Sequence, residues 1–555
     1  MKKLALVIIT AGIVAIPFKA QTSVSKPRKS SESFQEFRNR IKGNYSNFKK
    51  TILDHYADFL NGEWVEYESL NGLIRNETPK PEVIPSVDGK QIPPGKTVDT
   101  PEEETTEQPP AEAIPAQRLE LETTAVMIPE PEFVAEAEEI EEPELVAEAE
   151  TIEEVEPELV AEAEEILEPE LIIEPDFEDQ FQDEEELPPF IFPFYEIPMQ
   201  LVDLNFSIEE KVTNPQEFAA QWKNLSDAKV ADKLIPGIKE LIDETGFNDY
   251  LTYKLLESYA NAKFPEMSEA SRLSLVHFLL VNLGYDVRIA VSELGTPIML
   301  LPFQKTIYGN PYILIQDKKY YLFLPEGYDA TKVLSEKIMT CQLPPNTNTG
   351  NIFNLVLGEL RIPEKPKPFD LQYGPLHLTG EINENLMPIL YRYPQMPIED
   401  YAVSVIQPEL REKISEQIRE QLAGMEGDSD VEALLKFTQS AFDYATDDAY
   451  HGFEKPYFVE ETLYYPKNDC EDRAIFYTYF LRNALGRETQ LISYPGHEAA
   501  TVILSQPYHG VYYDHEGKKY YISDPTYLGA GTGMVMPQYQ NVLPNIDYTY
   551  PLPSE

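Results

Sequence analysis

Three residues near the C-terminal end of the chain have the side chains that thiol catalysis needs. Cys470 precedes an apolar helical run at 475–485, His497 precedes the apolar run 499–504, and Asp524 follows a run of β-type residues. Acyl transfer through a cysteine requires a thiol nucleophile, an imidazole base and a group that orients the base. The sequence therefore predicts a catalytic triad of Cys470, His497 and Asp524.

The local patterns around these residues predict the elements that position them. Asn468 or Asp469 is expected to cap the helix, which places Cys470 in its first turn. There the helix dipole and the free amide groups favour negative charge on sulfur. A β-hairpin is predicted over 511–522, and Asp524 follows it directly. A lone cysteine in an apolar helix more often packs than reacts, so the prediction depends on all three residues together.

The segments NDCEDRA, GHEAATV and YYISDPTY, which contain these residues, resemble in order and spacing the three motifs of the transglutaminase-like superfamily. The resemblance covers about residues 405–540 and is closest to secreted bacterial transglutaminase-like cysteine peptidases. It implies a papain-like fold with Cys470 as nucleophile, His497 as base and Asp524 as orienting group. Release of the acyl group by water would make a hydrolase, and release by an amine a crosslinking transglutaminase.

The same resemblance adds two weaker expectations about the site. In some members acidic neighbours of the cysteine bind calcium, which makes Asp469, Glu471 and Asp472 candidates by resemblance alone, and we predict no metal or cofactor from the residues themselves. The family often supplies an oxyanion donor from an aromatic or amide side chain upstream of the cysteine. Tyr464 and Tyr465 are the candidates that we name for that role.

An earlier stretch of the chain resembles the region around the three reactive residues in its pattern of apolar residues. The sequence KKYY recurs 200 positions apart, at 318–321 and 518–521, and a helical pattern recurs at an offset of 202. On that alignment Ser268, Gly295 and Leu324 stand where the three reactive residues stand. We interpret residues 199–340 as a degenerate transglutaminase-like domain without activity. The alternative is chance similarity between two βα-rich segments.

The N-terminal residues predict export. Residues 1–20 combine a short basic start, an apolar run at 4–16 and a plausible cleavage point after Ala20, which is the pattern of a signal peptide. The apolar run is too short for a membrane span, and no later run approaches the required length. We expect a periplasmic, cell-surface or secreted protein without a transmembrane span. Two cysteines, Cys341 and Cys470, exclude a disulfide scaffold.

An aromatic stripe follows the signal peptide. Within 21–77, mainly aromatic residues at spacings of three and four predict an amphipathic helix. Such a stripe packs on a folded domain or on a second copy, or it docks on a partner or on the cell envelope.

The acidic charge of the chain is concentrated in one segment. The 555 residues carry a formal charge of −51, and the segment 101–187 holds 34 acids and a single base. Proline-bounded repeats of the type PELVAEAEEI lie within it and are too short and too charged to bury a core. We predict a disordered, Pro/Glu-rich linker over 78–198. No concentrated basic surface is evident, which argues against nucleic acid as a partner.

These observations predict an exported α+β protein whose C-terminal domain is a cysteine peptidase or amidase acting on a protein or peptide. A crosslinking transglutaminase and a non-catalytic binding or scaffolding protein remain as alternatives. The predicted parts are a signal peptide (1–20), an aromatic-striped amphipathic helix (21–77), a disordered linker (78–198), a degenerate transglutaminase-like domain (199–340), a small β segment (341–405) and a transglutaminase-like catalytic domain (406–555).

Overall fold

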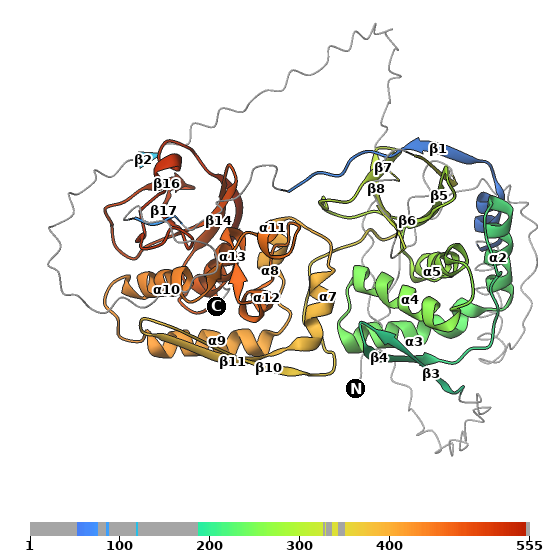
Figure 1. Ribbon diagram of the computed structural model, residues 1–555, viewed down its shortest axis with the longest axis horizontal. Helices are drawn as coiled ribbons and strands as arrows, with labels where there is room; N and C mark the ends of the chain where they lie inside the picture. The colour runs from blue at the N-terminus through green and yellow to red at the C-terminus, as the bar shows by residue number, and fades with distance from the viewer. Residues whose placement is uncertain are drawn as a thin grey trace, which may run out of the picture. The chain divides into compact units, whose positions relative to one another are not determined.

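The computed structural model describes residues 53–75, 85–87, 118–119, 187–325, 328, 333, 336–341 and 350–550. The chain divides into two units, and all described residues belong to the unit formed by residues 1–121 and 187–555. They form helices and mainly antiparallel sheets, which agrees with the predicted α+β class (Figure 1). The predicted signal peptide and the glutamate-rich repeats lie outside the described residues. Among the described helices, none combines the length and apolar character needed to cross a bilayer.

The first region contains a six-stranded sheet covered by helices. In spatial order the strands are β1 (Trp64–Glu68), β9 (Lys337–Cys341), β5 (Arg288–Ser292), β6 (Pro297–Leu301), β8 (Lys318–Phe323) and β7 (Tyr312–Ile315). The helices are α2 (Pro215–Asp227), α3 (Val230–Thr245), α4 (Asp249–Lys263) and α5 (Glu269–Leu283). Helix α5 packs against β5 and β6. The side chain of Ser268 caps α5 by accepting a hydrogen bond from the Ser271 amide at 3.2 Å.

The aromatic N-terminal segment packs on this region. Residues 53–61 are helical, and the Tyr56 ring stacks on Trp222 of α2 at 4.3 Å between centroids. The predicted helix over 21–77 does not extend through β1, where Trp64 to Glu68 pair with β9. Gly62 interrupts the helix, and the alternating sequence WVEYE then suits a strand. The rest of the predicted helix lies outside the described residues.

A proline-containing hairpin precedes the first region. Its strands are β3 (Pro189–Phe194) and β4 (Ile197–Val202), whose alternate apolar side chains are buried against α4 and α3. The prediction of a linker through residue 198 was therefore wrong for residues 189–198. The prolines suggested a linker, but a two-stranded hairpin leaves edges on which proline needs no ladder hydrogen bond.

The middle region is more helical than predicted. The predicted β segment over 341–405 does contain a hairpin, β10 (Pro366–Tyr373) and β11 (Leu376–Asn383). The remaining elements of that region are η1 (Glu384–Leu386), α7 (Met387–Tyr391) and α8 (Ile398–Val403). Proline at the first turn of α7 is compatible with a helix, which is why a proline-rich sequence hid these short helices.

The C-terminal region places one buried helix against a second sheet. Its helical elements are α9 (Pro408–Gln421), α10 (Ser429–Ser440), α11 (Asp447–Tyr450), α12 (Val459–Tyr464), α13 (Cys470–Asn483) and η2 (Pro537–Tyr539). The sheet order is β18 (Asn545–Tyr550), β14 (Thr489–Tyr494), β15 (His497–Val502), β17 (Lys518–Ser523), β16 (Tyr512–His515) and β2 (Arg118–Leu119). Helix α13 packs against β14 and β15 on one side and contacts α8, α10 and α12 (Figure 1). Because the helix is covered from several sides, its charged residues Glu471, Asp472 and Arg473 are buried together with its apolar ones.

Five strands of each large sheet follow the same spatial order. The order β9-β5-β6-β8-β7 matches β18-β14-β15-β17-β16, with antiparallel pairing throughout. The hairpin register also agrees, since Tyr312 faces Tyr321 in one sheet and Tyr512 faces Tyr521 in the other. In both regions one helix precedes the first of these strands along the chain and packs on the same strand pair.

Candidate active site

Cys470 is the first residue of α13. Asp469 occupies the N-cap position, and its amide donates a hydrogen bond to Asp472 Oδ2 at 3.1 Å. A short parallel pair of strands, β12 (Asp443–Tyr444) and β13 (Lys467–Asn468), leads the chain into this helix. The helix thus begins where the sequence predicted, and the thiol lies at the positive end of its dipole.

His497 and Asp524 meet at the ends of two neighbouring strands in the interior of the second sheet. His497 is the first residue of β15 and Asp524 follows β17, so the pairing of these two strands brings the side chains together. His497 Nε2 lies 2.9 Å from Asp524 Oδ2. Asp524 Oδ1 accepts hydrogen bonds from the amides of Thr526 at 2.8 Å and Tyr527 at 3.2 Å. The carboxylate is therefore fixed from both sides and holds the imidazole in one orientation.

The imidazole of His497 also interacts with Cys470. Burial opposes the charged imidazole, but the charge and hydrogen bond of Asp524, followed by the interaction with the Cys470 sulfur, hold the pKa of His497 well above its usual value. Because Nε2 of His497 interacts with Asp524, Nδ1 is the nitrogen left for the thiol. Among the described residues Nδ1 has no other hydrogen-bond partner. The structure thus brings together all three residues of the predicted triad.

The three side chains are closed off from solvent. Cys470 is 0 % exposed, and His497 and Asp524 are each 3 % exposed. Part of this cover comes from Tyr539 of η2, whose ring lies parallel to the imidazole of His497 at 5.6 Å between centroids. Tyr539 also donates a hydrogen bond to the Pro495 carbonyl at 3.1 Å. A polypeptide can reach the thiol only after this cover opens.

Tyr444 is a candidate site residue that the sequence did not reveal. Burial and the charges of Cys470 and Asp469 raise its pKa well above the usual value, so its hydroxyl remains a proton donor close to the thiol. For Tyr464 and Tyr465, which we named as oxyanion donors, the structure shows contacts to other residues. Tyr464 donates to Glu384 at 3.1 Å, and Tyr465 packs against Tyr457 at 5.1 Å between ring centroids. Tyr444 lies 26 positions before the cysteine, and no motif marks it.

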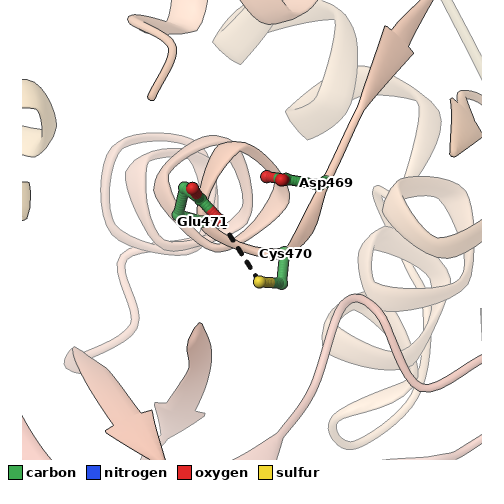
Figure 2. Close-up of side chains that lie close together, drawn as sticks. All are labelled: Asp469, Cys470 and Glu471. Atoms are coloured by element: carbon green, nitrogen blue, oxygen red, sulfur yellow. Dashed lines mark hydrogen bonds between the residues drawn. The ribbon is translucent and has the colours of Figure 1, made fainter. Parts of the chain in front are cut away.

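Buried carboxylates surround the start of α13. Asp447, Asp469 and Asp472 form one group whose oxygens lie within 4.8 Å of one another. Figure 2 shows the adjacent residues Asp469, Cys470 and Glu471, where Cys470 Sγ donates a hydrogen bond to Glu471 Oε2 at 3.2 Å. Several of these carboxylates also accept main-chain hydrogen bonds, for example Asp472 Oδ1 from the Tyr457 amide at 2.8 Å.

The chemistry of this group fits a hard divalent cation. Calcium takes carboxylate oxygens as ligands, and a cluster of buried, mutually repelling charges is stabilised by a cation. Asp447 is the member that the sequence did not reveal, because it lies 22 positions before Asp469 and joins the group only through the fold. The three aspartates, with Glu471, are the residues that would hold such an ion.

Two buried side chains, Arg473 and Gln439, stabilise the segments around the triad through hydrogen bonds. Arg473 donates to the carbonyls of Gln439 at 3.1 Å and Phe442 at 2.9 Å, and burial lowers its pKa to about 10. The Gln439 side chain donates to the carbonyls of Asp524, Tyr527 and Ala530 at 2.9 to 3.1 Å. Gln439 therefore ties the loop that carries Asp524 to helix α10.

The first region contains none of these reactive groups at the corresponding places. Ser268 caps α5, Gly295 adopts φ +87° in the turn before β6, and Leu324 follows β8. A cavity of about 560 Å³ opens here, and its lining includes Glu269 at the start of α5 and Leu324. Both cysteines are free and buried.

Comparisons with protein-family models, with curated proteins and with solved structures found no match. A functional assignment therefore rests on the motifs of the sequence and on the geometry of the site.

Proposed function

We propose that residues 406–555 form a transglutaminase-like, papain-like domain that acts as an exported cysteine peptidase or amidase. The observation that carries this proposal is the buried pair of His497 and Asp524, 2.9 Å apart, with the Cys470 thiol next to the imidazole at a helix start. Nucleophile, base and orienting group are the parts that thiol-dependent acyl transfer needs.

The proposed reaction begins with transfer of the Cys470 proton to His497 Nδ1. Asp524 stabilises the resulting imidazolium through Nε2, and the thiolate attacks the substrate carbonyl carbon to form a tetrahedral oxyanion. The main-chain amide of Cys470 and the hydroxyl of Tyr444 are the donors proposed to stabilise this oxyanion. When the C–N bond breaks, His497 returns its proton to the leaving amine, and the acyl group remains on sulfur as a thioester.

The second half of the reaction distinguishes a peptidase from a transglutaminase. In hydrolysis, His497 takes a proton from water, the hydroxide attacks the thioester, and the thiol is released. In transamidation a primary amine takes the place of water. We favour hydrolysis, since the motif resemblance is closest to bacterial cysteine peptidases.

A cleavage assay on the full chain tests the proposal. Denatured protein substrates are incubated with the wild-type protein, and new termini and new amine adducts are read by mass spectrometry, with and without a primary amine. Cys470→Ala and His497→Ala should abolish product formation. Cys341→Ala is the matched control, because it removes the other buried thiol from a strand of the first region. Activity that survives Cys470→Ala would refute the proposal.

We also propose that residues 199–340 are a degenerate copy of the same domain. The shared strand order, the shared hairpin register and the helix on the same strand pair support a common origin. Ser268, Gly295 and Leu324 in place of the triad support loss of chemistry.

The first-region cavity favours a second candidate function, a binding or scaffolding module. It lies where the copy would carry its reactive groups, and its lining contains both cations and anions, for example Lys254, Arg272 and Glu257. Binding of the cleavage substrates to the Cys470→Ala variant, lost on Lys254→Ala, would support a substrate-holding role for this region. Equal binding by both variants would refute it.

The proposed location is outside the cytoplasm, on the strength of the signal-peptide pattern. Envelope association through the aromatic helix has less support, because its described part packs on α2 through Tyr56. Fractionation of cells expressing the full chain tests both proposals.

A further inference from the structure

One residue in the loop after Asp524, Leu528, uses its main chain to pair with another part of the protein. Gln439 binds the carbonyls of Asp524, Tyr527 and Ala530 and accepts a hydrogen bond from the Gly529 amide at 3.1 Å. The amides of Thr526 and Tyr527 are taken by Asp524 itself. These inward hydrogen bonds fix the loop and leave the amide and the carbonyl of Leu528 to face a partner.

We call the amide and the carbonyl of Leu528 the Leu528 edge, and a distant piece of the same chain occupies it. The amide of Leu528 donates to the Pro85 carbonyl at 3.0 Å, and the amide of Val87 donates to the Leu528 carbonyl at 3.1 Å. Ser86 thereby forms a parallel bridge with Leu528. These two hydrogen bonds form a single isolated bridge, the smallest unit of the main-chain pairing by which a peptide strand adds to a protein backbone.

A second contact involves Arg75, and we call Arg75 and residues 85–87 together the arm. This contact lies next to His497. Arg75 Nη1 donates to the Met396 carbonyl at 3.2 Å, and Arg75 Nη2 lies 3.6 Å from a carboxylate oxygen of Glu498, the residue after His497. The side chains of Arg75 and Glu498 are only 6 % and 10 % exposed. The arm therefore touches the immediate neighbourhood of two of the three triad residues, each from a position about 400 residues earlier in the chain.

We propose that the Leu528 edge binds the extended backbone of a peptide substrate, and that residues 85–87 occupy it in cis and keep the site closed. This inference rests on the proposed function and adds how substrate is held and how the site is regulated. Main-chain pairing supplies affinity with little demand on side chains, which suits a protease acting on unfolded segments. In this proposal a substrate segment takes the place of residues 85–87 at Leu528 before its scissile bond is presented to Cys470.

The test measures the rate at which iodoacetamide labels Cys470 in the full chain, read by peptide mass spectrometry. Val87→Pro removes the amide that donates to Leu528, whereas Val87→Ala keeps it and is the matched control. Arg75→Ala removes the second contact. Cys341, buried in β9, reports general unfolding in the same sample.

Loss of one such hydrogen bond should speed Cys470 labelling by roughly three- to tenfold. We expect this increase in Val87→Pro and in Arg75→Ala, and a larger one in the double variant that combines these two changes. Labelling of Cys470 should not change in Val87→Ala, and labelling of Cys341 should not change in any variant. A synthetic peptide of residues 81–91 should slow labelling of the double variant, and a scrambled peptide should not. The inference is overturned if the double variant is labelled at the wild-type rate or if the peptide does not slow its labelling.

One further variant separates this inference from the proposed function. His497→Ala, added to the double variant, should slow labelling of the exposed thiol if the triad operates. If labelling stays fast without His497, the proposed chemistry fails while the role of the arm stands. If the arm variants have no effect but His497→Ala still slows labelling, the arm inference fails and the chemistry stands.

Discussion

Removing the charge of Asp524 tests the triad most directly. Asp524→Asn keeps the size and a hydrogen-bond acceptor at 2.9 Å from His497 Nε2 but deletes the buried negative charge. A hydrogen bond to a charged group contributes about 1.5 to 3 kcal/mol. Since one pKa unit corresponds to about 1.36 kcal/mol, the pKa of His497 should fall by about one to two units.

The fall in that pKa has a definite sign in the pH profile. The pKa of His497 is raised in the folded protein, so the imidazolium and the stability that it gains from Asp524 are fully present at acidic pH and are lost as pH rises through the raised pKa. Asp524→Asn moves that loss to lower pH. Because a smaller fraction of His497 is then protonated, less thiolate forms at Cys470. Labelling of Cys470 at pH 6.5 should therefore slow by about 10- to 150-fold.

The assay is the pH dependence of Cys470 labelling by iodoacetamide in the full chain. Asp203→Asn serves as the control, because Asp203 pairs with Lys263 in the first region, far from this chemistry in the sequence. Labelling of Cys341 checks that the fold is intact. An Asp524→Asn protein with the wild-type rate and the wild-type pH profile would refute the triad.

Three further changes probe other parts of the site. Glu460→Gln should lower the free energy of unfolding by about 3 to 5 kcal/mol in urea titrations, because it leaves the fully buried Arg411 without its charged partner. Tyr444→Phe should lower turnover about 100-fold while leaving the rate of Cys470 labelling unchanged, since alkylation forms no oxyanion. Calcium should raise the thermal midpoint of the wild-type chain, and Asp447→Asn should reduce that rise by removing a charged ligand.

Each of these changes has a control. Glu66→Gln disrupts an exposed pair with Lys337 and should leave unfolding unchanged, and an equal loss in both variants would contradict the argument from burial. A parallel fall in turnover and labelling in Tyr444→Phe would assign the tyrosine to structure and not to the oxyanion. A calcium effect that is the same in Asp447→Asn would place the ion elsewhere.

Local patterns in the sequence predicted the elements that carry the triad. The start of α13 at Cys470 follows from a capping residue before an apolar run, and the hairpin before Asp524 follows from two β-type runs around a turn. These signals act over a few residues, so they survive in a single sequence. The pairing of β15 with β17, which brings His497 to Asp524, was not predicted. The meeting of the two side chains was expected from their chemistry and from the motif resemblance.

Contacts between distant residues could not be predicted in the same way. Gln439 looks like any polar residue of an amphipathic helix until the loop after Asp524 folds against it. Arg75 shares no pattern with Glu498, more than 400 positions later. The hairpin β3–β4 was missed for another reason, because proline favours a linker over a strand unless the strand lies at an edge.

The charges around Cys470 pose a physical problem that the fold must solve. Asp469 and Glu471 flank the thiol, and both are fully buried, so each opposes a negative sulfur in a medium of low dielectric constant. Arg473 is buried nearby, but its donors are directed at Asn468 and at two carbonyls. The imidazolium of His497 is therefore the main positive group that faces the thiol within the described residues.

Two kinds of event would raise the reactivity of Cys470, and they act on different steps. A cation bound by the carboxylates reduces the repulsion at sulfur and so changes the chemical step. Displacement of residues 85–87 from Leu528 changes how often the thiol is accessible. Because the observed rate is the product of the open fraction and the rate within the open state, calcium should change labelling by the same factor with the arm bound or released. A factor that depends on the arm would mean that the carboxylate cluster and the Leu528 edge are coupled through the loop that Gln439 holds.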